Sequence, residues 1–300
     1  MIKQHIFYVP WTGLGLHNGF RGNKWLANRI KIFKSFVIPA LMKQTNKNFV
    51  LWCSWRPEEK DNLLVKDLRI HLERLDGLTI VFTYGGLCFY DDKYDDETAK
   101  KRLLHSLTLS LPALKQHVDF ADEVLLTINP SDDMFISTAI QTIQGADFGP
   151  NAVIGWEKGY CMNYADKTIA EYNPDTIAPF YTIKFPKDTF LDPKRHFDWI
   201  GPYRSHEYVR ELGFRALEGR GYVVGCHGAN ISTNWDIPYK GRILTPAETD
   251  SVMLRTGSYF TEPIIIKQNG RLLLRKLLNI LPFRDRIKDI YYKFNLNRYV

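Results

Sequence analysis

The chain up to Ile128 alternates between segments typical of β-strands and segments typical of amphipathic helices, and this order restricts the fold more than any other feature. Four apolar runs have the length and composition of buried strands: residues 5–9, 49–55, 78–84 and 123–128. Three longer segments carry apolar residues at helical spacing: residues 23–44, 57–75 and 96–118. This order predicts an α/β fold with a doubly wound, mostly parallel sheet and helices on both faces.

Two of the expected helices have details that a structure can check. Pro39 should kink or split the helix of residues 23–44, because proline cannot donate a backbone hydrogen bond. In the helix of residues 57–75 the leucines are expected to share one side; they are Leu63, Leu64, Leu68 and Leu72.

The second half of the chain is less regular. Residues 149–205 are rich in Tyr, Pro, Gly and Trp, and there we expect short strands and long loops that form a pocket. A helix is expected over residues 207–219 and a strand over residues 221–226. Beyond Pro263, two amphipathic helical segments follow.

Composition restricts the class of protein. A chain of 300 residues with 45% hydrophobic residues can bury a full core. The four cysteines lack metal-ligand spacing, so we expect reduced core residues in a reducing compartment. The apolar stretch before Pro10 is too short for a signal peptide, and no apolar run approaches the roughly 18 residues of a membrane span. A cytoplasmic protein is therefore expected.

The net charge of +7 is concentrated at the C-terminus. Residues 265–300 contain nine basic and two acidic residues, so the rest of the chain is neutral in sum. A neutral body argues against nucleic-acid binding, whereas a basic amphipathic tail suits an anionic membrane surface, here through residues 270–300 at the inner membrane face. Helices that pack on the body with a solvated basic face are an equal alternative.

The strongest candidate site is Ser131-Asp132-Asp133, directly after the fourth expected strand. Ligands of open α/β sheets bind at the carboxyl ends of strands. Two adjacent carboxylates are costly without a positive partner, and a hard divalent cation that bridges phosphates is the usual one. The alternative is that one aspartate only caps a helix beginning near Met134.

Several segments resemble the putative rhamnosyltransferase family and related glycosyltransferases of the GT-A fold. They are residues 25–33, 37–41, 44–45 and 48–52. The Ser131-Asp132-Asp133 sequence is similar to the D-x-D motif of that superfamily, with serine in place of the first acid. The resemblance spans roughly residues 5–235. It implies a metal-dependent, inverting hexosyltransferase that moves a sugar from a UDP-, dTDP- or GDP-sugar to a glycan or lipid-linked acceptor, with Mn²⁺ or Mg²⁺ as cofactor.

On this resemblance we expect a catalytic domain over residues 1–262 and a basic helical tail over residues 263–300. Within the domain, residues 1–133 would form the nucleotide-binding half and residues 134–262 the acceptor half. Asp133 would be the direct metal ligand and His227 a second one, since imidazole suits Mn²⁺. Asp132 would contact the ribose or a metal-bound water. A structural, hydrogen-bonded histidine is the alternative for His227.

An inverting transfer needs a group that takes the proton of the acceptor hydroxyl. The stretch from Ser205 to Tyr222 resembles the superfamily segment whose acid is this base, which suggests Glu207 or His206, with Asp198 in reserve. The spacing from Glu207 to Arg215 is two residues longer than in the family. Glu207 could instead simply stabilise the first turn of a helix.

The nucleotide is expected across the ends of the first three strands, where aromatic and polar residues would suit a pyrimidine base. The predicted contacts are Pro10, Trp11, Thr12, Trp55, Arg56, Thr83 and Tyr84, together with Ser131 and Asp132. Arg29 or Arg21 would neutralise phosphate. Two other functions stay open: a carbohydrate-binding protein that has lost catalysis, as Ser131 would allow, and a metal-dependent nucleotidyltransferase.

Overall fold

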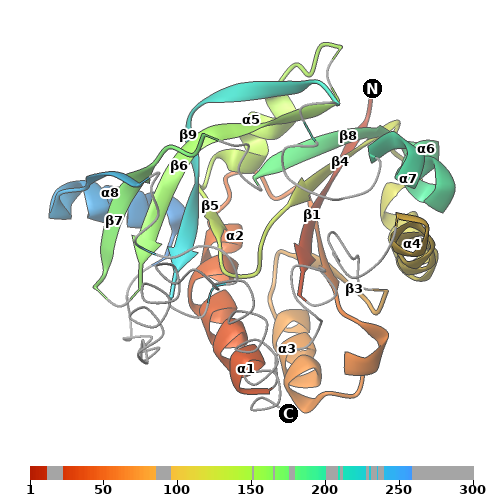
Figure 1. Ribbon diagram of the computed structural model, residues 1–300, viewed down its shortest axis with the longest axis horizontal. Helices are drawn as coiled ribbons and strands as arrows, with labels where there is room; N and C mark the ends of the chain where they lie inside the picture. Colours follow the sequence, from red (N-terminus) through yellow and green to blue (C-terminus); the bar gives the residue numbers. More distant parts are fainter. Residues whose placement is uncertain are drawn as a thin grey trace, which may run out of the picture.

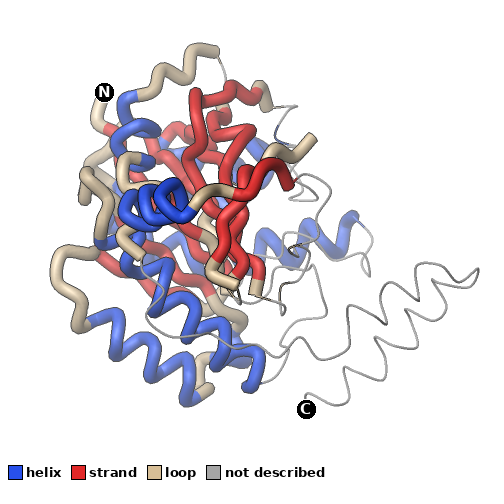
Figure 2. The backbone as a smooth tube through the Cα atoms, turned by 90° about the vertical axis from the view of Figure 1, so that its left-hand side faces the viewer, coloured by secondary structure: helices blue, strands red, loops and turns tan. Residues whose placement is uncertain are grey.

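The computed structural model describes residues 1–11, 23–85, 96–150, 152–164, 166–175, 180–200, 209, 212–227, 230, 235 and 240–258. The strands are β1 Lys3–Pro10, β2 Val50–Ser54, β3 Thr79–Thr83, β4 Glu123–Ile128, β5 Met134–Phe135, β6 Val153–Asn163, β7 Thr168–Tyr172, β8 Tyr181–Pro186, β9 Phe214–Cys226 and β10 Lys240–Ile243. They form one sheet in the order β10-β7-β6-β8-β4-β1-β2-β3, and β9 pairs with β5 and β6. Figure 2 shows the strands running through the middle of the molecule, with helices on both sides.

The first half of the chain folds as predicted. Strands β3, β2, β1 and β4 are neighbours and all pair in parallel. Their carboxyl ends lie in one row, since Pro10 is the partner of Ser54, and Ser54 the partner of Thr83. The ladder continues beyond the strands, because Trp11 N–H donates to Ser54 O and Trp55 N–H to Thr83 O, each at 3.0 Å.

Helices cover both faces of this parallel half. They are α1 Asn23–Ile32, α2 Ile38–Met42, α3 Leu63–Glu73, α4 Asp96–Val118, α6 Lys187–Leu191 and α7 Pro193–Ile200. Phe7 and Val9 of β1 pack on the side of α1 and α3, whereas Ile6 and Tyr8 pack on the side of α4. Figure 1 shows α1 beside α3 and, across the sheet, α4 near α6 and α7. The predicted α/β fold is confirmed.

The two checks on these helices have different outcomes. The helix is interrupted as predicted, because residues Phe33–Val37 form a π-helical turn between α1 and α2. This turn includes Ser35, whose carbonyl would clash with the ring of Pro39 in a regular helix. The prediction for the leucines was wrong at Leu63, which is 74% exposed. A 3₁₀ turn at Pro57–Glu59 precedes α3, Asn62 caps it, and its buried side consists of Val65, Leu68 and Leu72.

The second half departs from the prediction. Within residues 149–205 two of the strands, β7 and β8, are short as expected, but β6 is a long strand and pairs with the equally unexpected long strand β9. The helix expected over residues 207–219 was wrong from Phe214 onward, because β9 begins there. Gly221 permits this pairing: a Cβ atom at that position would lie 2.1 Å from the Trp156 ring. The expected strand over residues 221–226 is confirmed as the end of β9.

Two further elements, β5 and α8 (Pro246–Thr256), pack near the turn that follows β4. Strand β5 follows the two aspartates and pairs with β9, so no helix begins at Met134; the next helix is α5, Ala139–Gly145. Helix α8 begins with a Thr245–Glu248 capping box and packs in a core with Ile32 and Phe36. None of the helices in the described part of the chain is long and apolar enough to span a membrane.

Candidate functional site

The turn after β4 is held in a fixed shape. Asn129 N–H donates to Tyr8 O at 2.8 Å, which extends the β1–β4 ladder by one residue. Asp133 N–H then donates to Pro130 O at 3.2 Å and closes a β-turn. Within this turn Asp132 is only 7% and Asp133 only 6% exposed. The alternative that either residue caps a helix at Met134 is excluded, because Met134 belongs to β5.

The end of β9 lies directly against this turn. Gly225 N–H donates to Asp133 Oδ1 at 2.8 Å, and the Tyr164 hydroxyl donates to Asp132 O at 3.2 Å. A Cβ atom on Gly225 would lie 2.5 Å from Asp132 O and 2.6 Å from the Tyr164 ring. Only glycine allows this approach. The fold thus joins two chain segments that are far apart in sequence.

One oxygen of Asp132 collects three donors from separate parts of the chain. Asp132 Oδ2 forms an ion pair with Arg29 of α1. It also lies 3.0 Å from His227 Nε2 and 3.1 Å from Asn230 Nδ2. We refer to Arg29, Asp132, Asp133, His227 and Asn230 as the Asp132 cluster. The structure therefore brings together four of the predicted site residues and adds Asn230.

The two aspartates have opposite electrostatic environments. Burial alone would raise the pKa of Asp132, but Arg29 and His227 outweigh burial and lower that pKa to about 2. Burial and the neighbouring Asp132 charge raise the pKa of Asp133 well above its ordinary value. Burial also lowers the pKa of His227, although its hydrogen bond to Asp132 opposes this shift. At neutral pH Asp132 is ionised and Asp133 retains its proton much more readily.

The donor set of the cluster fits a hard divalent cation. Asp132 Oδ1 and Asp133 Oδ2 accept no hydrogen bond from described residues and are not among the fully buried unpartnered atoms. Since Arg29 balances only one carboxylate, two ionised aspartates would leave a negative charge for a cation to neutralise. No group of three or more His, Cys, Asp or Glu among the described residues could hold a metal by itself. A cation here would therefore need ligands from substrate phosphates or water.

The predicted nucleotide contacts lie along the same edge of the sheet. Pro10 ends β1 and Trp11 follows it, and Trp55 follows β2. The two tryptophan rings stack on each other at 4.5 Å and are 4% and 0% exposed, so neither presents an open face to a base. Thr83 is buried and accepts a hydrogen bond from Trp52 Nε1 at 2.8 Å.

The remaining predicted contacts differ in their exposure. Arg56 pairs with Glu59 at 3.3 Å, and Tyr84 is partly buried. Ser131 is buried in the turn itself. Thr12 and Arg21 lie outside the described residues.

The structure leaves the catalytic base as a prediction. His206 and Glu207 lie outside the described residues, as does the tail over residues 263–300. Asp198 is exposed on α7, and no contact joins it to the Asp132 cluster within the described part of the chain. Arg215, which the family pattern places after the base, lies in β9, and its guanidinium donates to Asp147 O.

Sequence reasoning missed three contributors to the cluster. Tyr164 and Gly225 hold the turn and β9 together, and Asn230 contacts Asp132. A signal existed for Asn230, because Gly228 lies between it and His227 and a tight turn after β9 would bring an asparagine side chain back. No comparable signal marks Tyr164, whose position depends on the pairing of β6 with β9.

No protein-family model matches the sequence, and no curated protein matches it. Residues 1–349 of TarS from S. aureus are similar over 100% of this chain and 81% of that one, with 13% identity and a TM-score of 0.40. The glycosyltransferase GlyE of Streptococcus pneumoniae is similar over 73% of this chain and 46% of its own, with 11% identity and a TM-score of 0.34. For the inositol-1-phosphate CTP transferase of T. maritima the coverages are 85% and 97%, with 11% identity and a TM-score of 0.35. Similarities this low do not assign an activity.

Proposed function

We propose that this chain is a glycosyltransferase that takes its sugar from a nucleotide-sugar donor. The observation that carries the proposal is the Asp132 cluster at the carboxyl end of β4. It combines a guanidinium and an imidazole with two adjacent carboxylates, each of which has one oxygen without a partner in the described part of the chain. Carboxylates, a cation and an arginine are the groups that bind the diphosphate of such a donor.

In this proposal each member of the cluster has a separate task. Asp133, and His227 if it exchanges its contact with Asp132, would hold Mn²⁺ or Mg²⁺. When bound, the cation would neutralise the negative charge that develops on the departing nucleoside diphosphate. Asp132 keeps only Oδ1 for a ligand, which suits the ribose or a metal-bound water. Arg29 holds Asp132 ionised and adds positive charge beside the diphosphate.

The acceptor side of the proposal depends on the family resemblance. A glycan or lipid-linked hydroxyl would attack the anomeric carbon, and Glu207, His206 or Asp198 would take its proton. Attack from the face opposite the leaving nucleotide would invert the configuration. The tail over residues 270–300 would bring the enzyme to an anionic membrane that carries a lipid-linked acceptor.

A panel of UDP-, dTDP- and GDP-sugars, tested for Mn²⁺-dependent release of the nucleoside diphosphate, tests the proposal. The same panel is repeated on Asp133→Ala and on Asp188→Ala, whose side chain is 80% exposed on α6 and serves as the matched control. We expect release by the wild type and the control, and a loss of about 100-fold or more for Asp133→Ala. Undiminished release by Asp133→Ala would refute its metal role.

Other outcomes identify the remaining functions. Binding of a nucleotide sugar without any turnover, even with acceptor glycans added, would favour a carbohydrate-binding protein. Release of pyrophosphate from a nucleoside triphosphate and a sugar phosphate would favour a nucleotidyltransferase.

A further inference from the structure

The Asn230 side chain connects the turn after β4 to the end of β9. Its Oδ1 accepts a hydrogen bond from His227 N–H at 2.7 Å. Its Nδ2 donates to Asp132 Oδ2 at 3.1 Å and also to Gly225 O. One amide group therefore contacts the turn after β4, the end of β9 and the residue that follows β9.

These contacts fix the orientation of the amide. Because a backbone N–H can only donate, the atom of Asn230 that faces His227 N must be the oxygen. The nitrogen must then face Asp132, where it has an acceptor. The hydrogen-bonding pattern thus leaves one orientation for this side chain.

The contact with Asp132 selects which carboxylate oxygen remains available. Asp132 Oδ2 is occupied by Arg29, His227 and Asn230, whereas Oδ1 accepts nothing from the described residues. A bound diphosphate could attract the Arg29 guanidinium away from Asp132, and a bound cation could attract the His227 imidazole. Asn230 is neutral and is anchored to two backbone atoms, His227 N and Gly225 O, so a bound diphosphate or cation would not attract it in the same way.

We propose that Asn230 is a positioning residue that holds the Asp132 carboxylate and the His227 ring in the arrangement that binds the nucleoside diphosphate. This inference rests on the proposed function and adds to it. Asn230 need not touch the substrate. It keeps Oδ2 of Asp132 turned toward the protein and Oδ1 free for the ligand.

Two variants separate this role from a purely structural one. Asn230→Asp keeps an oxygen for His227 N–H but removes the donor to Asp132, whereas Asn230→Ala removes both contacts. Asn62→Asp is the control, because Asn62 caps α3 and its Oδ1 accepts from Leu64 N–H, a role that aspartate performs equally well. If Asn230 holds Asp132, both Asn230 variants weaken Mn²⁺-dependent binding of UDP, dTDP or GDP by about 10- to 100-fold. If Asn230 serves only to accept the hydrogen bond from His227 N–H, Asn230→Asp binds as the wild type does, which would overturn the proposal.

A thermal double-mutant cycle on the ligand-free protein tests the contact without reference to activity. In the wild-type background Asn230→Asp places two carboxylates together and should lower the Tm by about 5 °C. In an Asp132→Asn background the new carboxylate gains an amide donor, so the decrease should shrink below about 2 °C. Equal decreases in both backgrounds would overturn the contact. Failure of the wild type to bind any of the three nucleotides would instead refute the proposed function, and with it the binding role of Asn230, while the cycle would still decide the contact.

Discussion

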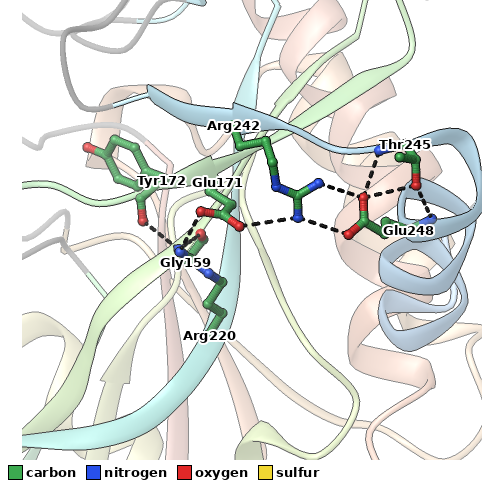
Figure 3. Close-up of polar contacts among 7 residues, drawn as sticks. All are labelled: Gly159, Glu171, Tyr172, Arg220, Arg242, Thr245 and Glu248. Carbon is green, nitrogen blue, oxygen red and sulfur yellow. Dashed lines mark hydrogen bonds and ion pairs between the residues drawn. The ribbon is translucent and has the colours of Figure 1, made fainter.

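Two groups of arginine and carboxylate side chains in this molecule are alike in composition. They differ in whether all of their carboxylate oxygens have partners among the described residues. The first is the Asp132 cluster. The second, which we name the Glu171 network, consists of Glu171, Arg220, Arg242 and Glu248 (Figure 3). Both join segments distant in sequence. Only the Asp132 cluster lies at the carboxyl ends of parallel strands.

The Glu171 network uses all of its carboxylate oxygens. Glu171 Oε2 accepts from Arg220 at 3.2 Å and Glu171 Oε1 from Arg242 at 3.4 Å. Arg242 donates to both oxygens of Glu248 at 2.8 Å. As Figure 3 shows, these contacts tie β7, β9 and β10 to the start of α8. The arginine and glutamate side chains are 19–54% exposed, so solvent screens their attraction.

A structural ion-pair network thus differs from a candidate ligand site in the hydrogen bonding and exposure of its carboxylates. Burial without full satisfaction is costly, and the Asp132 cluster combines nearly buried carboxylates with two oxygens that have no hydrogen-bond partner among the described residues. In the Glu171 network every carboxylate oxygen accepts a hydrogen bond, and the side chains are partly exposed to solvent.

Replacing one arginine in each group should give the largest difference in stability between the two groups. Arg29→Met leaves Asp132 buried without its cation and should lower the free energy of unfolding by about 3–5 kcal/mol. Arg242→Met in the Glu171 network should cost several-fold less, because its partners stay hydrated. Urea denaturation monitored by circular dichroism measures both. Equal losses would show that the two ion pairs are equivalent and would remove the distinction.

Adding one methyl group tests the close approach of the backbone. Gly225→Ala places a Cβ atom 2.5 Å from Asp132 O and should cost about 2–3 kcal/mol. Gly241→Ala, beside the Glu171 network, meets Asn173 Nδ2 at 3.0 Å and Glu171 Cβ at 3.1 Å, which can move. We expect a cost of about 1 kcal/mol or less there. Urea denaturation measures both costs. An unchanged free energy of unfolding in Gly225→Ala would contradict the close packing of Gly225 against Asp132 O.

Asp133 should reduce stability at neutral pH. Burial and Asp132 raise its folded-state pKa, so the folded protein binds more protons than the unfolded chain between the two pKa values. Its favourable contribution is therefore present at low pH and is lost as pH rises through the folded-state pKa. Asp133→Asn keeps the acceptor for Gly225 N–H and should gain about 1 kcal/mol at pH 8. The gain should vanish below pH ~4, near the unfolded pKa. A variant less stable than the wild type at pH 8 would contradict this account.

Glu248 should respond to pH in the opposite direction and more weakly. Hydrogen bonds from Arg242 and Thr245 lower its pKa to about 2. The stabilisation is therefore present above the unfolded pKa and is lost as pH falls toward 2. Glu248→Gln should lower the Tm at pH 6 by about 2 °C or less, and by nothing measurable in 1 M salt. Thermal melts at low salt and in 1 M salt measure this change in Tm. A large decrease in Tm that does not depend on salt would show that the Glu171 network behaves like the Asp132 cluster.

The sequence was sufficient to predict the parallel half of the fold because each of its elements carries a local signal. The observed bounds of α4 and β4 equal the predicted ones, since the helix carries apolar residues at helical spacing and the strand is a continuous apolar run. Long strands in the second half were not predicted. Residues 214–219 include charged residues at spacings compatible with a helix, and only pairing with β6 makes them a strand.

The candidate site shows the same limit. Asp132 and Asp133 were identified from their position after a strand, and Arg29 and His227 from their chemistry and the family resemblance. That Arg29 and His227 share one oxygen of Asp132 could not be predicted, because the contact brings together α1 and the residues after β4 and β9, which are far apart in sequence. The role of Trp11 and Trp55 in packing is likewise a tertiary property.

Isothermal titration of UDP, dTDP and GDP, each with and without Mn²⁺, into the wild type and Asp133→Ala measures whether the Asp132 cluster binds the donor nucleotide. If the Asp132 cluster is a nucleotide-sugar site, at least one nucleotide binds the wild type saturably in the presence of Mn²⁺. Its affinity should then fall about 10- to 100-fold either without Mn²⁺ or in Asp133→Ala. No binding of any nucleotide, or equal binding by the wild type and Asp133→Ala, would contradict the claim.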